Sequence, residues 1–468
     1  MNYREEGDFL GKVNIQDKNY WGVHTYRALD NFSLSDYKIH NTFIKAYGYV
    51  KLACILTIKE LNVWTEEKSN AILQACERLI NGELNDQIVV DPFQGGAGTS
   101  LNMNINEVIA NCALEILGKK KGEYSYVHPI DDVNLYQSTN DTYPTALKIA
   151  CIYLLRELEK NVIALQESFE NKEKEFSDIV KVARTQLMDA VLITLGKEFS
   201  AYSEAIARDR WRIYKCEERL RVVNIGGTAV GTGLSAPRKY IFSVIEKLRD
   251  LTGISLARAE NLVDNTQNWD TFAEVSGILK AHATNLIKIS NDLRLMNSGP
   301  QAGFSEIILP PKQSGSSIMP GKINPVIPEA AAQIGIKVLG NDVVINQCIS
   351  MGQLELNQFS PLIAFSFIEE LTLLSNANAM LKKHCIDSIK PNLDNINRTL
   401  SKSNVLLTAL LPALGYSKTN EIAEQIANST CSVKEYVLDN GIMTEEDFDY
   451  YTAPEMILSL GHKDIIDN

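Results

Sequence analysis

A long apolar stripe between Trp269 and Met296 constrains the fold of this chain more than any other feature. Its apolar residues, mostly three, four or seven positions apart, are Phe272, Val275, Leu279, Leu286, Ile289 and Leu293. This is the period of one face of an α-helix, and at 1.5 Å per residue such a helix would span roughly 40 Å. Similar patterns cover residues 145–176, 199–221 and 329–339 onward. The sequence therefore predicts a mainly α protein with a central bundle of long helices.

These apolar stripes are too long to be covered fully within one chain. Polar residues such as Asn285, Lys288 and Asn291 lie between the apolar positions of the 269–296 segment. The remaining faces of such helices have to pack against further helices. We therefore expect the bundle to extend across the subunits of a homo-oligomer.

Composition and charge limit the class of protein. The 468 residues carry a formal net charge of -12, and a nucleic-acid partner is not expected because phosphate binding needs a basic surface. Eight scattered cysteines without a CxxC pair predict buried free thiols rather than a metal or redox motif. No apolar export segment and no run of about 18 apolar residues occurs. We expect a cytoplasmic protein with no membrane partner.

Four polar segments interrupt the helical pattern. They are Gly95–Glu107 (GGAGTSLNMNINE), His128–Asp141 (HPIDDVNLYQSTND), Arg184–Ala190 (RTQLMDA) and Gly315–Glu329, which begins GSSIMPGKINP. Each alone could be a set of turns and helix caps, because Gly, Ser, Thr and Asn favour both. Together they supply many neutral hydrogen-bond donors and few charges, which suits the binding of a small carboxylate.

The four segments resemble the signature regions of the aspartase/fumarase superfamily, whose best-known mark is GSSxMPxKxNP. Within it, GGAGTSLNMNINEVIAN, QSTND, RTQL and NIGGTAVGTG (Asn224–Gly233) are most similar to the aspartate ammonia-lyase version. The resemblance covers nearly the whole chain. It implies an N-terminal domain over 1–140, a central helical bundle over 141–396 and a small helical domain over 397–468. It also implies a homotetramer with a 20-helix core and active sites shared by three subunits.

The chemistry implied by the resemblance is elimination of an amine from an amino acid. A base removes a proton next to a carboxylate, an aci-carboxylate intermediate forms, and a trans unsaturated acid results; aspartate giving fumarate and ammonia is the first expectation. The reaction needs a placed base and donors around the carboxylate that gains charge. It needs no organic cofactor, and no metal-ligand cluster is expected.

Ser316 matches the catalytic base of the family by its position in the signature. A serine hydroxyl is a poor base unless it ionises, so its alkoxide has to be stabilised by backbone N–H groups in a closed loop. Lys322 and Asn324 match the residues that bind the α-carboxylate, with Ser317 as a neighbouring donor. Glu329 would either orient this loop or cap the helix that follows.

The other site residues implied by the resemblance carry hydroxyl or amide groups. Those that would hold the carboxylate on which charge builds are Thr99, Ser138 and Thr139. Asn140, with help from Thr99, corresponds to the contact for the leaving amine. Thr185 and Gln186 match a pair supplied by another subunit.

Several positions depart from the family pattern as the resemblance gives it. Asp132, Tyr136 and Met188 stand where histidine, a small residue and glutamine are usual, and Gln301 and Ser360 replace an arginine and a glutamate. One interpretation is neutral drift. The other is a shifted specificity, because a carboxylate near an anion pocket disfavours a dianion and the new side chains add bulk. An ergothionase-like lyase that releases trimethylamine from a betaine would be such a relative.

Two further alternatives belong to other functional classes. Hydration of fumarate is one, although RTQL and GGAGTS differ from the fumarase pattern. A non-catalytic structural relative is the other, and the intact Ser316, Lys322 and Asn324 argue against it.

Overall fold

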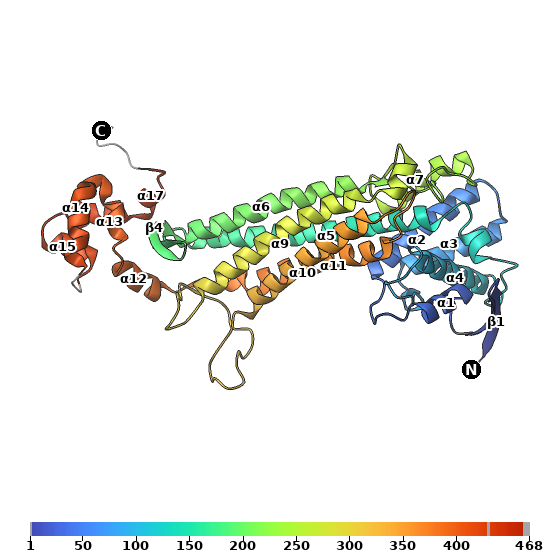
Figure 1. Cartoon of the computed structure of the whole chain (residues 1–468), viewed down its shortest axis with the longest axis horizontal. Coiled ribbons are helices and arrows are strands. Elements are labelled where there is room, and N and C mark those ends of the chain that lie inside the picture. The colour runs from blue at the N-terminus through green and yellow to red at the C-terminus, as the bar shows by residue number, and fades with distance from the viewer. Residues whose placement is uncertain (1, 428–430, 462–468) are drawn as a thin grey trace. The chain divides into compact units, whose positions relative to one another are not determined.

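The computed structural model describes residues 2–427 and 431–461, most of which form α-helices (Figure 1). The chain folds into two compact units. The first consists of Met1–Glu159, Trp211–Ala281 and Lys337–Ser375, and the second of Lys160–Arg210, His282–Ile336 and Asn376–Asn468. These units interleave along the sequence. The division into 1–140, 141–396 and 397–468 follows chain order instead and stays a prediction.

Long helices contribute residues to both units. They are α5 (Thr139–Glu175), α6 (Leu195–Leu220), α9 (Asp270–Met296), α10 (Val326–Ser350) and α11 (Ser360–His384) (Figure 1). The six apolar residues that predict the stripe of α9 are at most 1% exposed. The mainly α class and the four long helical segments expected from the sequence are confirmed.

The first unit contains the N-terminal helices and two helices from the middle of the chain. They are α1 (Val23–Asn31), α2 (Asn41–Glu60), α3 (Glu66–Ile80), α4 (Thr99–Ile116), α7 (Arg238–Thr252) and α8 (Leu262–Gln267), with single turns at Asn85–Gln87 and Pro129–Val133. Strands β1 (Tyr3–Asp8) and β2 (Gly11–Gln16) form an antiparallel hairpin, and β5 (Val222–Val223) pairs in parallel with β6 (Ala257–Arg258). Helix α2 packs against α3 and α7, and α3 packs against α4.

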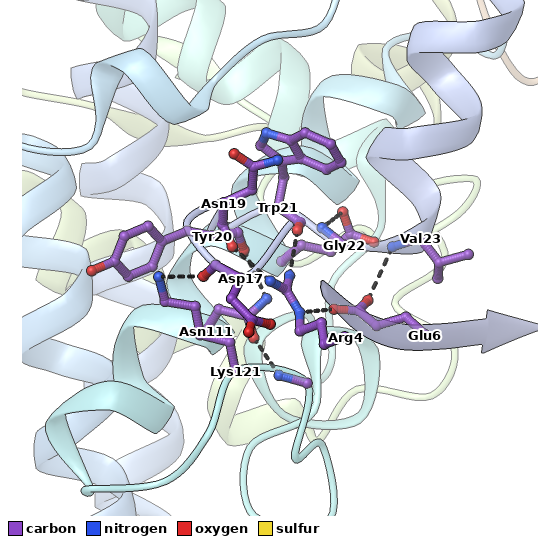
Figure 2. Close-up of polar contacts among 12 residues, drawn as sticks. Arg4, Glu6, Asp17, Asn19, Tyr20, Trp21, Gly22, Val23, Asn111 and Lys121 are labelled. Carbon is purple, nitrogen blue, oxygen red and sulfur yellow. Dashed lines mark hydrogen bonds and ion pairs between the residues drawn. The ribbon is translucent and has the colours of Figure 1, made fainter. Parts of the chain in front are cut away.

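Buried polar contacts fasten the β1–β2 hairpin to the start of α1 (Figure 2). Arg4 Nε donates to Glu6 Oε1 at 2.7 Å, and Glu6 Oε2 accepts from the Val23 N–H at 3.1 Å. Glu107, at the end of the first polar segment, accepts from the Thr25 hydroxyl at 2.6 Å and from the backbone N–H groups of residues 22, 24 and 25. This carboxylate is therefore fully engaged in holding α1 against α4.

The second unit contains the antiparallel hairpin of β3 (Val180–Thr185) and β4 (Met188–Thr194) and the C-terminal helices. These are α12 (Leu393–Ser401), α13 (Leu406–Ala409), α14 (Leu411–Ile426), α15 (Val433–Asp439), α16 (Glu445–Thr452) and α17 (Pro454–Ile457). Strand β7 (Ile307–Ile308) pairs with β8 (Lys390–Pro391), which follows the single turn Ile386–Ser388. Leu192 of β4 joins the apolar core of the C-terminal helices, which includes Leu410, Ile422, Val437 and Phe448.

All eight cysteines lie in the described part of the chain as free thiols, and seven of them are buried. This confirms the expectation from their scattered spacing. Burial raises the pKa of Cys54 to about 12, which keeps its thiol protonated and unreactive. No helix among the described residues is long and apolar enough to cross a membrane.

Glu370 of α11 is a carboxyl group buried in the helical core of the first unit. Its Oε1 atom accepts from the Ser276 hydroxyl at 3.3 Å, and Asp342 accepts from the same hydroxyl at 3.0 Å. Burial raises the pKa of Glu370 to about 9, and the nearby Asp342 charge adds to this. The folded state therefore keeps this group protonated at neutral pH.

This raised pKa predicts a loss of stability with rising pH. The folded pKa lies above the unfolded value, so the contribution of Glu370 is complete below the unfolded pKa and is lost as the pH rises through about 9. We expect Glu370→Gln to melt at a higher temperature than the parent at pH 8–9 and to show a smaller difference at pH 5. Its neighbour Glu369, which pairs with Lys337, provides the control variant Glu369→Gln. The same shift at every pH would contradict this account.

Candidate active site

Thr99 lies at the first position of α4, after a glycine turn that only glycine can form. Gly98 has φ 91°, and a Cβ atom there would come within 2.3 Å of the Tyr143 ring. The Thr99 hydroxyl donates to the Gly96 carbonyl at 2.7 Å and is exposed. The close approach of α4 and α5 at Gly98 therefore fixes where this hydroxyl lies.

Ser138, Thr139 and Asn140 form the loop and first turn at the start of α5. Ser138 Oγ accepts from the Asn140 N–H at 3.2 Å, and Thr139 Oγ1 accepts from Asn102 Nδ2 of α4 at 3.0 Å. Asn102 stands one helical turn after Thr99, so this hydrogen bond brings the two polar segments together. Because an amide N–H occupies the Thr139 oxygen, the Thr139 hydroxyl proton is left to donate elsewhere.

Asp141 joins this loop to the NIGGTAVGTG segment. Its buried carboxylate accepts from the N–H groups of Ser138 at 2.9 Å, Gly226 at 3.2 Å and Thr228 at 3.0 Å. Burial raises the pKa of Asp141 to about 7, although these backbone hydrogen bonds oppose the shift. The Asp141 carboxylate therefore holds the loop before α5 and the 226–228 loop together.

Pro144 lies near the start of α5 and has no N–H group. It therefore cannot form the helical hydrogen bond to the carbonyl of Asn140, four residues earlier. Asn224 Nδ2 donates to this carbonyl instead, at 2.9 Å. The Asn140 side chain donates to the Ala229 carbonyl at 2.7 Å. Both contacts place Asn140 against the 224–233 segment.

A buried lysine beneath this loop was missed by the sequence analysis. Lys51 of α2 is 0% exposed, and its Nζ atom donates to Asn134 Oδ1 at 3.1 Å and to Gln137 Oε1 at 2.9 Å. Asn102 Nδ2 and Asn106 Nδ2 donate to the same Asn134 oxygen at 3.1 and 3.2 Å. A lysine inside the apolar run AYGYVKLACIL was the signal that could have revealed it.

Ser316 lies in a largely exposed loop that is closed by two hydrogen bonds to backbone carbonyl groups. Gly315 N–H donates to the Lys322 carbonyl at 2.9 Å, and Asn324 Nδ2 donates to the Gly315 carbonyl at 2.8 Å. Ser316 Oγ accepts from the N–H groups of residues 318 and 319 at 3.2 and 2.9 Å. These two N–H groups meet the requirement that an alkoxide be stabilised by the backbone.

The other members of the signature loop point toward solvent or toward the helix that follows. Ser317 and Lys322 are exposed. Glu329 lies in the first turn of α10 and pairs with Arg294 at 3.4 Å. Whether Glu329 orients the loop or caps the helix stays a prediction, since its partner is Arg294 of α9.

Thr185 and Gln186 lie at the turn of the β3–β4 hairpin. The two turn residues, Gln186 and Leu187, have φ 54° and 65°, a conformation that usually selects Asn-Gly. A non-glycine pair held there is strained, and such strain is frequent at functional sites. Arg184, just before the turn, pairs with the buried Glu306 at 2.7 Å and braces the hairpin.

The three specificity candidates have different surroundings. Asp132 is 7% exposed, lies 2.6 Å from Lys68 Nζ and accepts from the His128 N–H at 2.7 Å. Its charge is therefore compensated within the first unit. The Tyr136 ring lies 5.6 Å from the Tyr240 ring, and Met188 is exposed next to the hairpin turn. A role of these residues in specificity stays a prediction.

The site residues thus form two groups. The first group belongs to the first unit and consists of Thr99, Ser138, Thr139 and Asn140. The second group belongs to the second unit. It consists of a loop with Ser316, Ser317, Lys322 and Asn324 and a hairpin turn with Thr185 and Gln186. Within the described residues, no group of three or more His, Cys, Asp or Glu side chains is placed to hold a metal ion.

Known proteins are similar to this chain in both sequence and fold. The Lyase family pattern matches residues 11–340, and the Fumarase C C-terminus pattern matches residues 406–459. Aspartate ammonia-lyases of Bacillus subtilis and Escherichia coli are 44% and 43% identical, covering 97% and 99% of this chain and 95% and 97% of those proteins. A Brucella melitensis fumarate lyase:delta crystallin structure bound to cobalt has a TM-score of 0.93 at 42% identity, covering 97% of this chain and 99% of that one. A class II fumarase from Schistosoma mansoni has a TM-score of 0.91 at 30% identity, covering 98% and 100%.

These matches define the class of protein as a lyase, and the fold is mainly helical. The chain belongs to the aspartase/fumarase superfamily, and its similarity to aspartate ammonia-lyases runs over nearly its full length.

Proposed function

We propose that the chain catalyses the reversible elimination of ammonia from aspartate to give fumarate. The observation that carries this proposal is identity of 41–44% over nearly full length to several aspartate ammonia-lyases. The chain also contains a serine whose oxygen already accepts two backbone N–H groups. No organic cofactor enters the reaction.

In this mechanism the Ser316 alkoxide takes one proton from the carbon beside the substrate's side-chain carboxylate. The electron pair of that C–H bond moves into the carboxylate, which becomes the doubly charged aci form. Hydroxyl donors at Ser138 and Thr139 stabilise this charge, joined by Thr99 when its proton turns from the Gly96 carbonyl to the substrate. One such donor is worth about 3 kcal/mol of barrier. The C–N bond then breaks, ammonia leaves, and the electron pair forms the double bond of fumarate.

The remaining groups hold the substrate for this step. Lys322 and Asn324 bind the α-carboxylate, and Asn140 contacts the amine. Ser317 is a further donor on the same loop. Thr185 and Gln186 complete the site from another subunit. Bound this way, the substrate presents its proton to Ser316 and its developing charge to the hydroxyl cluster.

The active enzyme is a homotetramer in which each site draws residues from three chains. Exposed apolar side chains along α10 support self-association: Ile336 and Val343, seven residues apart on one helix face, are each 60% exposed. Burial of such a face in a helical core shared between chains would remove this apolar surface from water. The cytoplasmic location also stays part of this proposal.

A substrate panel tests the proposed function directly. The purified chain is incubated with aspartate, with fumarate plus ammonium, with fumarate alone, and with a trimethylammonium betaine of an aromatic amino acid. We expect absorbance of fumarate to appear from aspartate and aspartate to form from fumarate plus ammonium. Malate from fumarate alone would favour a hydratase, and trimethylamine release without aspartate turnover would favour the shifted specificity.

A further inference from the structure

Lys51 is a buried cation whose partners are neutral. Both of its hydrogen-bond acceptors are side-chain amide oxygens, of Asn134 and Gln137. No carboxylate in the described part of the chain forms a salt bridge with it, and Asp141 acts on it only through the longer-range charge interaction. Burial lowers the pKa of Lys51 to about 8. Burying a charge without an ionic partner is costly, so the contacts of Lys51 have to be examined for a function that offsets this cost.

The partners of Lys51 lead directly to the carboxylate-binding loop. Asn134 Nδ2 donates to the Gln137 carbonyl at 3.2 Å, which closes the 134–137 turn. Lys51 donates to the first and the last residue of this turn. The Asn134 oxygen also accepts from Asn102, whose amide donates to the Thr139 hydroxyl. A continuous set of hydrogen bonds therefore runs from the buried ammonium group to a donor of the site.

We propose that Lys51 is a positioning residue for the elimination: it fixes the 134–140 loop, and its positive charge stabilises the negative charge that develops on the substrate carboxylate held there. This inference rests on the proposed function. The positive charge of Lys51 stabilises the bound carboxylate most when that carboxylate becomes doubly charged, because electrostatic interactions are strong in a buried environment. Lys51 therefore acts mainly on the transition state and less on the bound substrate.

Lys148 provides a matched control in the same unit. It is also buried, at 3% exposure, and burial lowers its pKa to about 8. Its Nζ atom donates to the Val222 carbonyl at 2.7 Å and to Asn265 Oδ1 at 3.1 Å, and neither partner belongs to the 134–140 loop. The variants Lys51→Met and Lys148→Met each remove one buried ammonium group and keep a long side chain.

The kinetic test compares kcat and KM for aspartate in the two variants. We expect Lys51→Met to lower kcat about 100-fold with KM changed less than about threefold, because losing an interaction that acts mainly on the transition state lowers kcat more than it changes KM. Lys148→Met is expected to keep kcat within about threefold of the parent. Equal losses in both variants, a Lys51→Met kcat near that of the parent, or a loss confined to KM would overturn the proposal.

Hydrogen exchange of the peptide covering residues 134–141 tests the positioning claim without any substrate. We expect faster exchange in Lys51→Met than in the parent and in Lys148→Met, and unchanged exchange would overturn the claim. If the parent makes no fumarate from aspartate, the proposed function fails while the exchange result still decides the positioning role. If Lys51→Met does not fold, Gln137→Leu removes one of the two acceptors and is expected to produce the same effects in weaker form; parent-like exchange and kcat in Gln137→Leu would then overturn the proposal.

Discussion

Ser316→Ala is expected to lower kcat for aspartate by about 10³-fold or more, since a placed base contributes 10²- to 10⁴-fold and here it starts the reaction. The variant is expected to keep the melting temperature and the oligomeric state of the parent. The serine is half-buried in a largely exposed loop, and its hydroxyl oxygen accepts hydrogen bonds from the N–H groups of residues 318 and 319. Water can satisfy both N–H groups when the hydroxyl is removed.

Ser314→Ala is the matched control for this prediction. Ser314 is exposed, lies two residues before the half-buried Ser316 in the same loop, and has no role in the proposed mechanism. The measurement is the initial rate of fumarate formation followed by absorbance. If Ser316→Ala kept the parent rate, or if Ser314→Ala lost as much, serine 316 would not be the base.

Lys322→Met is expected to lower kcat/KM for aspartate by about 100-fold, because a hydrogen bond between two charged groups is worth up to about 3 kcal/mol. Lys322 is the cation proposed to bind the α-carboxylate, and it is exposed in the free chain. The loss should fall on both KM and kcat, since a substrate held by one end presents its proton less well to the base.

Lys312→Met is the control for Lys322→Met. Lys312 is an exposed lysine just before the same loop, and its replacement removes the same charge from the chain. Titration of initial rates with aspartate separates KM from kcat in both variants. A normal kcat/KM in Lys322→Met would place the α-carboxylate elsewhere.

The long helices were predictable because their cause is local. The stripe of α9 repeats with the helical period, and the predicted residues are the buried ones. The start of α5 was predicted six residues too late, at residue 145, although the helix begins at Thr139. Pro144 directly precedes the predicted start, but Asn224 donates to the carbonyl that the proline leaves without its helical partner. That hydrogen bond joins residues 84 positions apart, so a local sequence pattern cannot reveal it.

The candidate site was only partly accessible from the sequence. The polar segments identified Thr99 and the 138–140 loop, and the structure connects them through Asn102. Lys51 was missed because a single lysine in an apolar helix is indistinguishable from a lysine at the surface until its burial is known. The role of Asp132 in specificity stays a prediction, and its ion pair with Lys68 was not predictable because the two residues are far apart in the sequence.

The central claim is that one active site joins residues of different chains, and hybrid tetramers test it most directly. Ser316→Ala and Thr139→Val chains, each inactive alone, are coexpressed in equal amounts, and mass spectrometry verifies that hybrids form. In the proposed tetramer, Ser316 and Thr139 of one site come from different chains. With random assembly, each of these two chains is intact at the required position about half of the time, so about one quarter of the sites receive both intact residues. We predict recovery of about one quarter of the parent activity. Hybrids that remain as inactive as either variant alone would contradict a site shared between chains.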